Sequence, residues 1–349
     1  MGTPEFAVES LKRLVEGGYN VVAVVTQPDK PVGRHQDTLQ PSQVKQYAVE
    51  HGLPVLQPVK MKDPEFVEQL RSYQADLQVV VAFRMLPEVV WAMPKFGTFN
   101  VHAALLPQYR GAAPINWAVI NGEKETGVTT FFLDHDIDTG RIIKQKRFPI
   151  PESADVEYVY DGLMHLGADL ALETIDALIA AGGNIESMPQ EKLMGEGELK
   201  SAPKIFKETC RIDFHKPAKQ VYDFVRGLSP YPGSWTEIKK KAPVVIFEDA
   251  DGEMPEATAH PAQQKSAAKI QVLKIFKTSL TEFSRGVAPV GSLRVFEKKL
   301  QVACLDHWLN IEELQLSGKK RMDAAAFLNG MKDIAYYECQ KAQETGEEW

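Results

Sequence analysis

The stretch Phe99-Asn100-Val101-His102-Ala103-Ala104-Leu105-Leu106-Pro107 decides the expected fold of the first half of this chain. Its first residues are typical of a strand, and Asn100 and His102 are two positions apart, so their side chains leave the same face. The strand is expected to end directly after His102. In a doubly wound sheet, ligands bind outside the carboxyl ends of the strands. The segment therefore fits a ligand site, although a capping asparagine and a half-buried histidine fit the spacing too.

Strand-like and helix-like segments alternate on both sides of this stretch. Residues 21–25 (VVAVV) are typical of a buried strand. Thr3, Pro4 and Glu5 fit an N-cap, a first-turn proline and a first-turn acid of a helix. The alternation predicts an α/β domain over residues 1–185 with a doubly wound, mostly parallel, Rossmann-like sheet. Further strands are expected at 53–56, 77–83, 98–102 and 128–133, and helices at 7–15, 43–50, 65–71, 114–120 and 158–181.

The second half has a different pattern. A polar stretch predicts a linker at residues 186–207. Many short strands with turn residues between them then predict a small, OB-like β-barrel domain at 208–318, followed by a C-terminal helix and tail at 319–349. A helix is expected at 213–227, a surface loop at 249–268, and strands at 235–238, 244–247, 270–275, 291–296, 300–304 and 308–315.

Composition narrows the class of protein. With 44% hydrophobic and 25% charged residues the chain is ordinary for a globular protein, and no apolar run is long enough to cross a bilayer. Cys210, Cys304 and Cys339 are scattered without metal-like spacing, which fits a reducing cytoplasm. The net charge of −7 argues against a wholesale nucleic-acid coat but allows a local basic patch. We expect a cytoplasmic monomer with no membrane segment.

An acidic segment, Leu133-Asp134-His135-Asp136-Ile137-Asp138-Thr139-Gly140, directly follows a predicted strand. Such a segment fits an acidic turn, a cation site, or an acid held near a catalytic base. The spacing matches neither an EF-hand loop nor a standard transition-metal site.

Several longer motifs resemble those of one enzyme family, the 10-formyltetrahydrofolate-dependent formyltransferases. They cover nearly the whole chain, and the resemblance is strongest to members that formylate methionyl initiator tRNA. The motifs are MGTPEFA (1–7), VVTQPDKPVGR (24–34), NVHAALLPQYRGAAPINWAVINGE (100–123), ETGVTTFFLDHDIDTG (125–140), RGLSPYPGSW (226–235) and SGKKRMDAAAFLNG (317–330).

The resemblance implies that Asn100, His102 and Asp138 are the catalytic residues. A neutral amine attacks the formyl carbon on N10 of the folate, so the carbonyl oxygen gains negative charge and donors must already point at it. Asn100 and a protonated His102 can donate, and Asp138 would orient the imidazolium. This chemistry needs no metal, so we expect none.

The resemblance also implies where substrates bind. It places 10-formyltetrahydrofolate beside Phe83, Arg84, Met85 and Leu86. A second folate-binding stretch falls on Ala104, Leu105, Leu106 and Pro107, where the family usually has serine in place of Ala104, and core packing explains the two leucines equally well.

For tRNA, the resemblance points to Arg34 near the acceptor end and to Lys319, Lys320 and Arg321 on the barrel. Charge alone fits ordinary solvated residues at these positions. The main alternative is a formyltransferase acting on an amino sugar or nucleotide sugar. A folate- or RNA-binding protein without activity is a further alternative, against which Asn100, His102 and Asp138 argue.

Members of the family have a strand before the segment that matches Gly2-Thr3-Pro4-Glu5-Phe6. The sequence starts at Met1, so that strand is not part of it. A missing inner strand would leave backbone groups unpaired, and we expect an upstream start in the native gene product.

Overall fold

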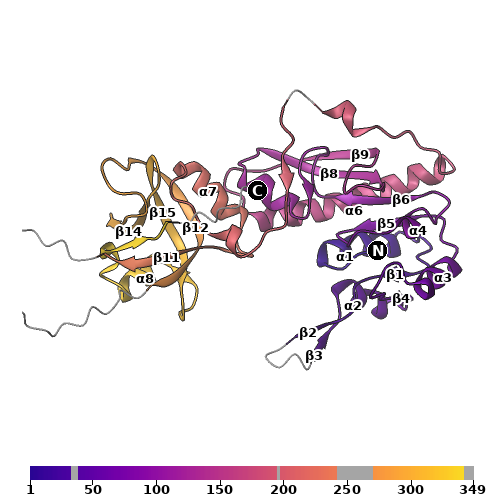
Figure 1. The fold of residues 1–349 in the computed structure, drawn as a ribbon, viewed down its shortest axis with the longest axis horizontal. Helices are drawn as coiled ribbons and strands as arrows, with labels where there is room; N and C mark the ends of the chain where they lie inside the picture. Colours follow the sequence, from indigo (N-terminus) through magenta and orange to yellow (C-terminus); the bar gives the residue numbers. More distant parts are fainter. Residues whose placement is uncertain (33–37, 195–196, 242–269, 342–349) are drawn as a thin grey trace, which may run out of the picture. The chain divides into compact units, whose positions relative to one another are not determined.

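The computed structural model describes residues 1–32, 38–194, 197–241 and 270–341, and the predicted strand at 244–247 and loop at 249–268 lie outside them. The chain divides into two compact units, Met1–Ile205 and Phe206–Trp349, which we describe separately (Figure 1). None of the helices that the structure describes is both long and apolar enough to span a bilayer.

The first unit contains the expected doubly wound arrangement. Strand β1 (Val24–Val25) pairs in parallel with β4 (Val55–Leu56), and β5 (Gln78–Val81) in parallel with β6 (Thr98–His102). The sheet then continues with antiparallel β8 (Glu125–Phe132) and β9 (Ile142–Pro149). The remaining elements are α1 (Glu5–Glu16), β2 (Lys30–Val32), β3 (Thr38–Gln40), α2 (Gln43–Glu50), α3 (Pro64–Ser72), α4 (Glu88–Trp91), β7 (Arg110–Gly111), α5 (Pro114–Ile120), α6 (Val156–Ala180), η1 (Gln190–Leu193) and β10 (Ser201–Ala202).

Met1 and Gly2 connect the two parallel pairs of strands. The amino group of Met1 donates to the Val79 carbonyl at 2.7 Å, and the amide of Gly2 donates to the Val25 carbonyl at 3.0 Å. Gly2 also forms a parallel bridge with Val81. A cavity of about 500 Å³ adjoins them, between residues 21–25 and the start of β5.

Two local predictions were wrong, and one strand was missed. The strand expected at 21–25 is reduced to Val24–Val25. Thr3 is not the N-cap of α1: Pro4 occupies that position, and no side chain caps the helix. Strand β9 was not predicted, because its sequence IIKQKRFP has no run of apolar residues and its side chains are mostly half-exposed.

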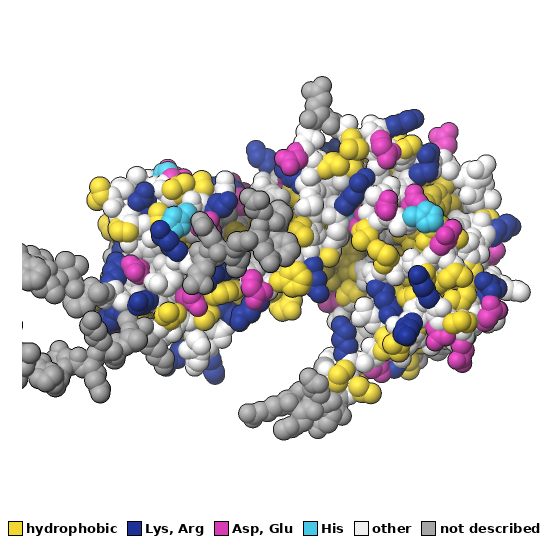
Figure 2. All heavy atoms as spheres, viewed as in Figure 1, with side chains coloured by type: hydrophobic (Ala, Val, Ile, Leu, Met, Phe, Trp, Pro, Cys, Tyr) yellow, Lys and Arg dark blue, Asp and Glu magenta, His cyan; other side chains and the backbone are white. Residues whose placement is uncertain are grey.

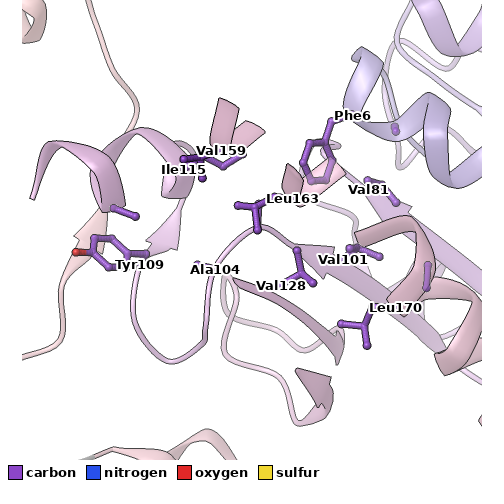
Figure 3. Packing of buried hydrophobic residues seen from close by; sticks show 14 of the residues in the cluster. Phe6, Val81, Val101, Ala104, Tyr109, Ile115, Val128, Val159, Leu163 and Leu170 are labelled. Atoms are coloured by element: carbon purple, nitrogen blue, oxygen red, sulfur yellow. The ribbon is translucent and has the colours of Figure 1, made fainter. Parts of the chain in front are cut away.

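The core of the first unit lies between helices and sheet (Figure 3). Leu163 and Leu170 of α6 are buried with Val101 of β6 and Val128 of β8. Burying a leucine contributes about 1.5–3 kcal/mol, so the face of α6 that carries these residues holds the strand that bears Asn100 and His102 in place.

The second unit is a nearly closed antiparallel barrel, as predicted. Its sheet extends into the predicted C-terminal tail, because Met322–Asp323 and Tyr337–Cys339 form strands that pair with it. Its sheet has the order β13-β14-β15-β12-β11-β17, and a bridge from Ser292 to Glu338 brings the two ends together. Irregular pairing along β12 fits the bending that closure requires. Its elements are η2 (Glu208–Cys210), α7 (Ala218–Gly227), β11 (Ser234–Lys240), β12 (Gln271–Ser284), β13 (Leu293–Phe296), β14 (Lys299–Ala303), β15 (His307–Leu316), β16 (Met322–Asp323), α8 (Ala324–Gly330), η3 (Ile334–Tyr336) and β17 (Tyr337–Cys339).

Most of the predicted linker is part of the first unit, whose boundary lies at Ile205. Strand β10 pairs in parallel with β7, and the carbonyl of Ala202 accepts from the amide of Ala113 at 3.1 Å. We call residues 186–194 and 197–205 the return segment, because after α6 they lead back to β7.

Candidate active site

The three predicted catalytic residues line one cavity of about 890 Å³ in the first unit. Asn100 and His102 come from β6, and Asp138 comes from the loop between β8 and β9. Acidic and histidine side chains lie beside hydrophobic ones on the visible face of this unit (Figure 2). Because His102 is the last residue of β6, the cavity lies at the carboxyl end of that strand, where ligands bind in a doubly wound sheet.

The imidazole of His102 is held by a hydrogen bond at Nε2, and its Nδ1 faces a carboxylate. Its Nε2 lies 2.9 Å from the carbonyl oxygen of Tyr109, which can only accept, so Nε2 carries a proton. Its Nδ1 lies 3.8 Å from Oδ2 of Asp138, beyond a direct hydrogen bond. Since only 6% of the side chain is exposed, the backbone contact fixes the ring and leaves Nδ1 as the nitrogen available to a substrate.

Asp138 is held in a conformation that few residues adopt. Its φ of +56° lies in the left-handed region, which costs a non-glycine residue about 1–2 kcal/mol. The amide of Gly111 donates to Oδ2 of Asp138 at 3.0 Å. This bond aims the carboxylate toward the His102 ring.

The amide of Asn100 has an unsatisfied end. Its Oδ1 is buried and has no hydrogen-bond partner among the described residues. Such a group costs about 1–3 kcal/mol, and the two ends of an amide are distinguished only by their partners. An amide that is short of partners in a cavity is suited to bind a substrate oxygen or nitrogen.

The segment Phe83–Leu86 lines the same cavity. Met85 is 66% exposed, whereas Leu86 is buried. The guanidinium of Arg84 donates to the carbonyls of Pro58 and Val59, so it fastens two loops together. A folate here would meet Phe83 and Met85 more readily than the Arg84 head group.

The second predicted folate stretch does not line this cavity. Ala104 and Leu106 are buried, and Leu106 packs with Phe131 and Ile142. The hydroxyl of Thr129 donates to the Ala104 carbonyl at 2.6 Å and accepts from the Leu106 amide at 3.1 Å. The chain is buried again after His102. The stretch Ala104, Leu105, Leu106 and Pro107 therefore packs next to the end of β6 and stabilises it.

The predicted tRNA contacts have different surroundings. Arg34 lies outside the described residues, and in the sequence it falls between β2 and β3, which pair with each other. Asp29 directly precedes β2. A hydrogen bond from Lys45 and another from Gln57 hold the pKa of Asp29 below its usual value.

On the barrel, Lys319, Lys320 and Arg321 are all exposed, but the Arg321 head group is engaged by other residues. Its guanidinium donates to both carboxylate oxygens of Glu313, at 2.6 and 2.7 Å, and lies 4.2 Å over the ring of Phe276. This fork-shaped pairing gives Arg321 a structural role.

Two backbone contributions to the site were not predicted from the sequence. The carbonyl of Tyr109 holds His102, and the amide of Gly111 holds Asp138. Both lie in the QYRG motif, but backbone atoms carry no residue-specific signal. Within the described ranges, no group of three or more His, Cys, Asp or Glu residues is placed to hold a metal ion.

Comparison with solved structures supports the fold. The chain superposes on a sugar 3N-formyl transferase, WlaRD, with a TM-score of 0.57 and 19% identity over 91% of this chain and 97% of that one. The N-formyltransferase of Helicobacter canadensis gives a TM-score of 0.55 and 22% identity over 89% and 96%.

Comparison with known sequences identifies the family. Methionyl-tRNA formyltransferase of Parabacteroides distasonis is 56% identical over 339 residues, 97% of this chain and 96% of that protein. The enzyme of the same name from Phocaeicola vulgatus is 58% identical over 334 residues, 95% and 94% of the two chains. A formyl transferase model matches residues 1–175, and a formyl transferase C-terminal domain model matches residues 204–332. The chain therefore belongs to the formyl transferase family.

Proposed function

We propose that this chain transfers the formyl group of 10-formyltetrahydrofolate to the α-amino group of methionyl initiator tRNA. The observation that carries the proposal is the meeting of Asn100, His102 and Asp138 at one cavity. It is supported by relatives of 53–58% identity that carry the name methionyl-tRNA formyltransferase.

In the proposed reaction, the amine nitrogen bonds to the formyl carbon and a tetrahedral intermediate forms. The bond from that carbon to N10 then breaks, N10 gains one proton and the amine loses one. The Asn100 amide and the Nδ1–H of a protonated His102 would donate to the developing oxyanion, where such donors have their largest effect. Asp138, 3.8 Å from Nδ1, stabilises the cationic ring electrostatically.

The amine substrate decides between this proposal and its alternative. The structures that share the fold include sugar formyltransferases, but at 19–22% identity they show the fold alone. The curated relatives match over both units, and the second unit is a barrel, an architecture that suits nucleic-acid backbones. Lys and Arg side chains on its visible face are mixed with acidic and hydrophobic ones, so we expect a few phosphate contacts (Figure 2).

The test is a formylation assay with 10-formyltetrahydrofolate and two acceptors, methionyl initiator tRNA and a dTDP-linked amino sugar. We expect the enzyme to formylate the tRNA and not the amino sugar, and we expect His102→Ala to lose formylation of the tRNA. If the enzyme formylates the amino sugar but not the tRNA, the result supports the alternative.

A further inference from the structure

Gln190 is a completely buried polar side chain in a segment that the sequence predicts to be a polar linker. It is the first residue of η1 in the return segment, and its exposed fraction is 0%. Glu191 and Lys192, its neighbours, are exposed. Neither matched family range, 1–175 or 204–332, includes Gln190. A buried amide is costly to the fold unless its hydrogen bonds are satisfied.

The amide of Gln190 makes four hydrogen bonds. Its Nε2 donates to the carbonyls of Asp138 and Gly140, each at 2.8 Å. Its Oε1 accepts from Nε and Nη2 of Arg110, at 3.1 and 2.7 Å. Both amide protons and both oxygen lone pairs are used, which is the full capacity of the group. The flipped orientation would put an oxygen against two carbonyls, so the partners fix the orientation.

These bonds connect the two segments that determine where the Asp138 carboxylate lies. One segment is the loop of Asp138 itself, whose left-handed backbone must be held by its surroundings. The other is β7, where Arg110 precedes Gly111, the residue whose amide donates to Asp138 Oδ2. Gln190 therefore fixes both the backbone that carries the carboxylate and the strand that aims it.

Other residues of the return segment hold β7 as well. The Tyr109 amide donates to the Lys200 carbonyl at 2.6 Å, and β10 pairs with β7. At Gly111, with φ of +127°, an added Cβ would lie 2.4 Å from the Ala202 carbonyl oxygen, so only glycine allows this approach. The carbonyl of Tyr109 is also the group that holds His102.

We propose that Gln190 is a positioning residue for the catalytic pair: it sets the Asp138 carboxylate relative to His102 without touching substrate. The inference rests on the proposed function, since it requires Asp138 to act in formyl transfer. A displacement of about 1 Å in a catalytic group costs on the order of a hundredfold in rate. Removing the Gln190 bonds should therefore act on turnover rather than on binding.

The test uses the full chain and two substitutions. Gln190→Met keeps the length of the side chain and removes all four bonds, whereas Gln190→Glu keeps the acceptor for Arg110 and removes the donors to Asp138 and Gly140. We expect each to lower kcat by about 10–100-fold while KM for 10-formyltetrahydrofolate and for methionyl-tRNA changes by less than about threefold. Glu191→Ala, in the same turn and exposed, is the matched control and should keep wild-type kcat.

A double substitution separates positioning from a general structural role. If Gln190 acts through Asp138, then Gln190→Met combined with Asp138→Asn should be no slower than Asp138→Asn alone. Rate reductions that multiply, or a Gln190→Met variant with wild-type kcat, would overturn the inference. Thermal unfolding of each variant, read by circular dichroism, shows whether it is folded, and Gln190→Glu still tests the idea if Gln190→Met does not fold. If Asp138→Asn itself keeps full activity, the proposed mechanism is wrong. That outcome is distinguishable from a failure of the role of Gln190 alone.

Discussion

Nδ1 of His102 and Oδ2 of Asp138 lie 3.8 Å apart, close enough for strong electrostatic coupling but too far for a direct hydrogen bond. The carboxylate is directed by the Gly111 amide, and the ring by the Tyr109 carbonyl. The pair is therefore held by the backbone on both sides, and a substrate atom that approaches Nδ1 meets a ring whose orientation is already set.

We expect Asp138→Asn to lower kcat by about a hundredfold or more, because the neutral amide no longer stabilises a cationic His102 as charge develops. KM for 10-formyltetrahydrofolate should change by less than about threefold, since the effect arises in the transition state. Steady-state kinetics with saturating methionyl-tRNA measure both. Asp161→Asn makes the same chemical change on the exposed side of α6 and should leave both constants unchanged. A tenfold higher KM with unchanged kcat would assign Asp138 to binding instead.

Two substitutions at Asn100 distinguish an oxyanion donor from a packing residue. Asn100→Asp preserves the shape but replaces a donor with a negative charge. We expect it to lose at least as much activity as Asn100→Ala, which itself should cost about a hundredfold in kcat. A packing role predicts the opposite order, with the isosteric aspartate nearly as active as wild type. Asn184→Asp, an exposed position, controls for the added charge.

The side-chain hydroxyl and the backbone carbonyl of Tyr109 have separate roles, and Tyr109→Phe removes the hydroxyl while leaving the carbonyl in place. The hydroxyl donates to Glu123 at 2.6 Å, and burial raises its pKa, so it remains a protonated donor near neutral pH. Removing it should lower the free energy of unfolding by about 1 kcal/mol while the carbonyl still holds His102. Urea denaturation and kcat, measured on one preparation, test the two halves of this prediction. A large fall in kcat without loss of stability would mean that the hydroxyl takes part in the site.

The three cysteines should be unreactive in the native protein. Burial raises the pKa of Cys210 and Cys304, and that of Cys339 to about 12, so the reactive thiolate is disfavoured at all three sites. A thiol-reactive chromogen should label none of them quickly in buffer and all three in denaturant. Because thiolate increases with pH, residual native labelling should rise from pH 8 to pH 10. Rapid labelling of one thiol at pH 8 would show that its site opens.

Much of this site was readable from the sequence because it depends on residue type and strand period. The spacing of Asn100 and His102 placed them at a strand end, and resemblance added Asp138. Other parts depend on tertiary contacts that leave no local pattern. Ala104 and Leu106 belong to a family motif but are buried and do not line the cavity, and Gln190 is a buried residue within a polar stretch. The barrel was predicted from short alternating strands. Nothing in the sequence Lys319-Lys320-Arg321 indicates that, among the described residues, Arg321 is the one paired with a carboxylate.

The pairing of Arg321 leads to a last prediction, about the barrel and tRNA. Lys319, Lys320 and Arg321 are all exposed, but the Arg321 guanidinium pairs with Glu313 and lies over the ring of Phe276. If the two lysines bind phosphates, replacing both with alanine should weaken tRNA binding. It should also make the logarithmic dependence of affinity on salt shallower, by about one unit for each phosphate that is no longer neutralised.

Arg321→Ala should behave differently from the lysine pair. It removes the fork on Glu313, so we expect a lower urea midpoint and a salt slope like that of wild type. Filter binding of methionyl-tRNA at several salt concentrations, together with urea denaturation, measures both quantities. Alanine at Lys12 and Lys124, two exposed lysines of the first unit, removes the same charge and controls for net charge. The division of roles is wrong if Arg321→Ala lowers the salt slope at unchanged stability, or if the lysine pair leaves the slope unaltered.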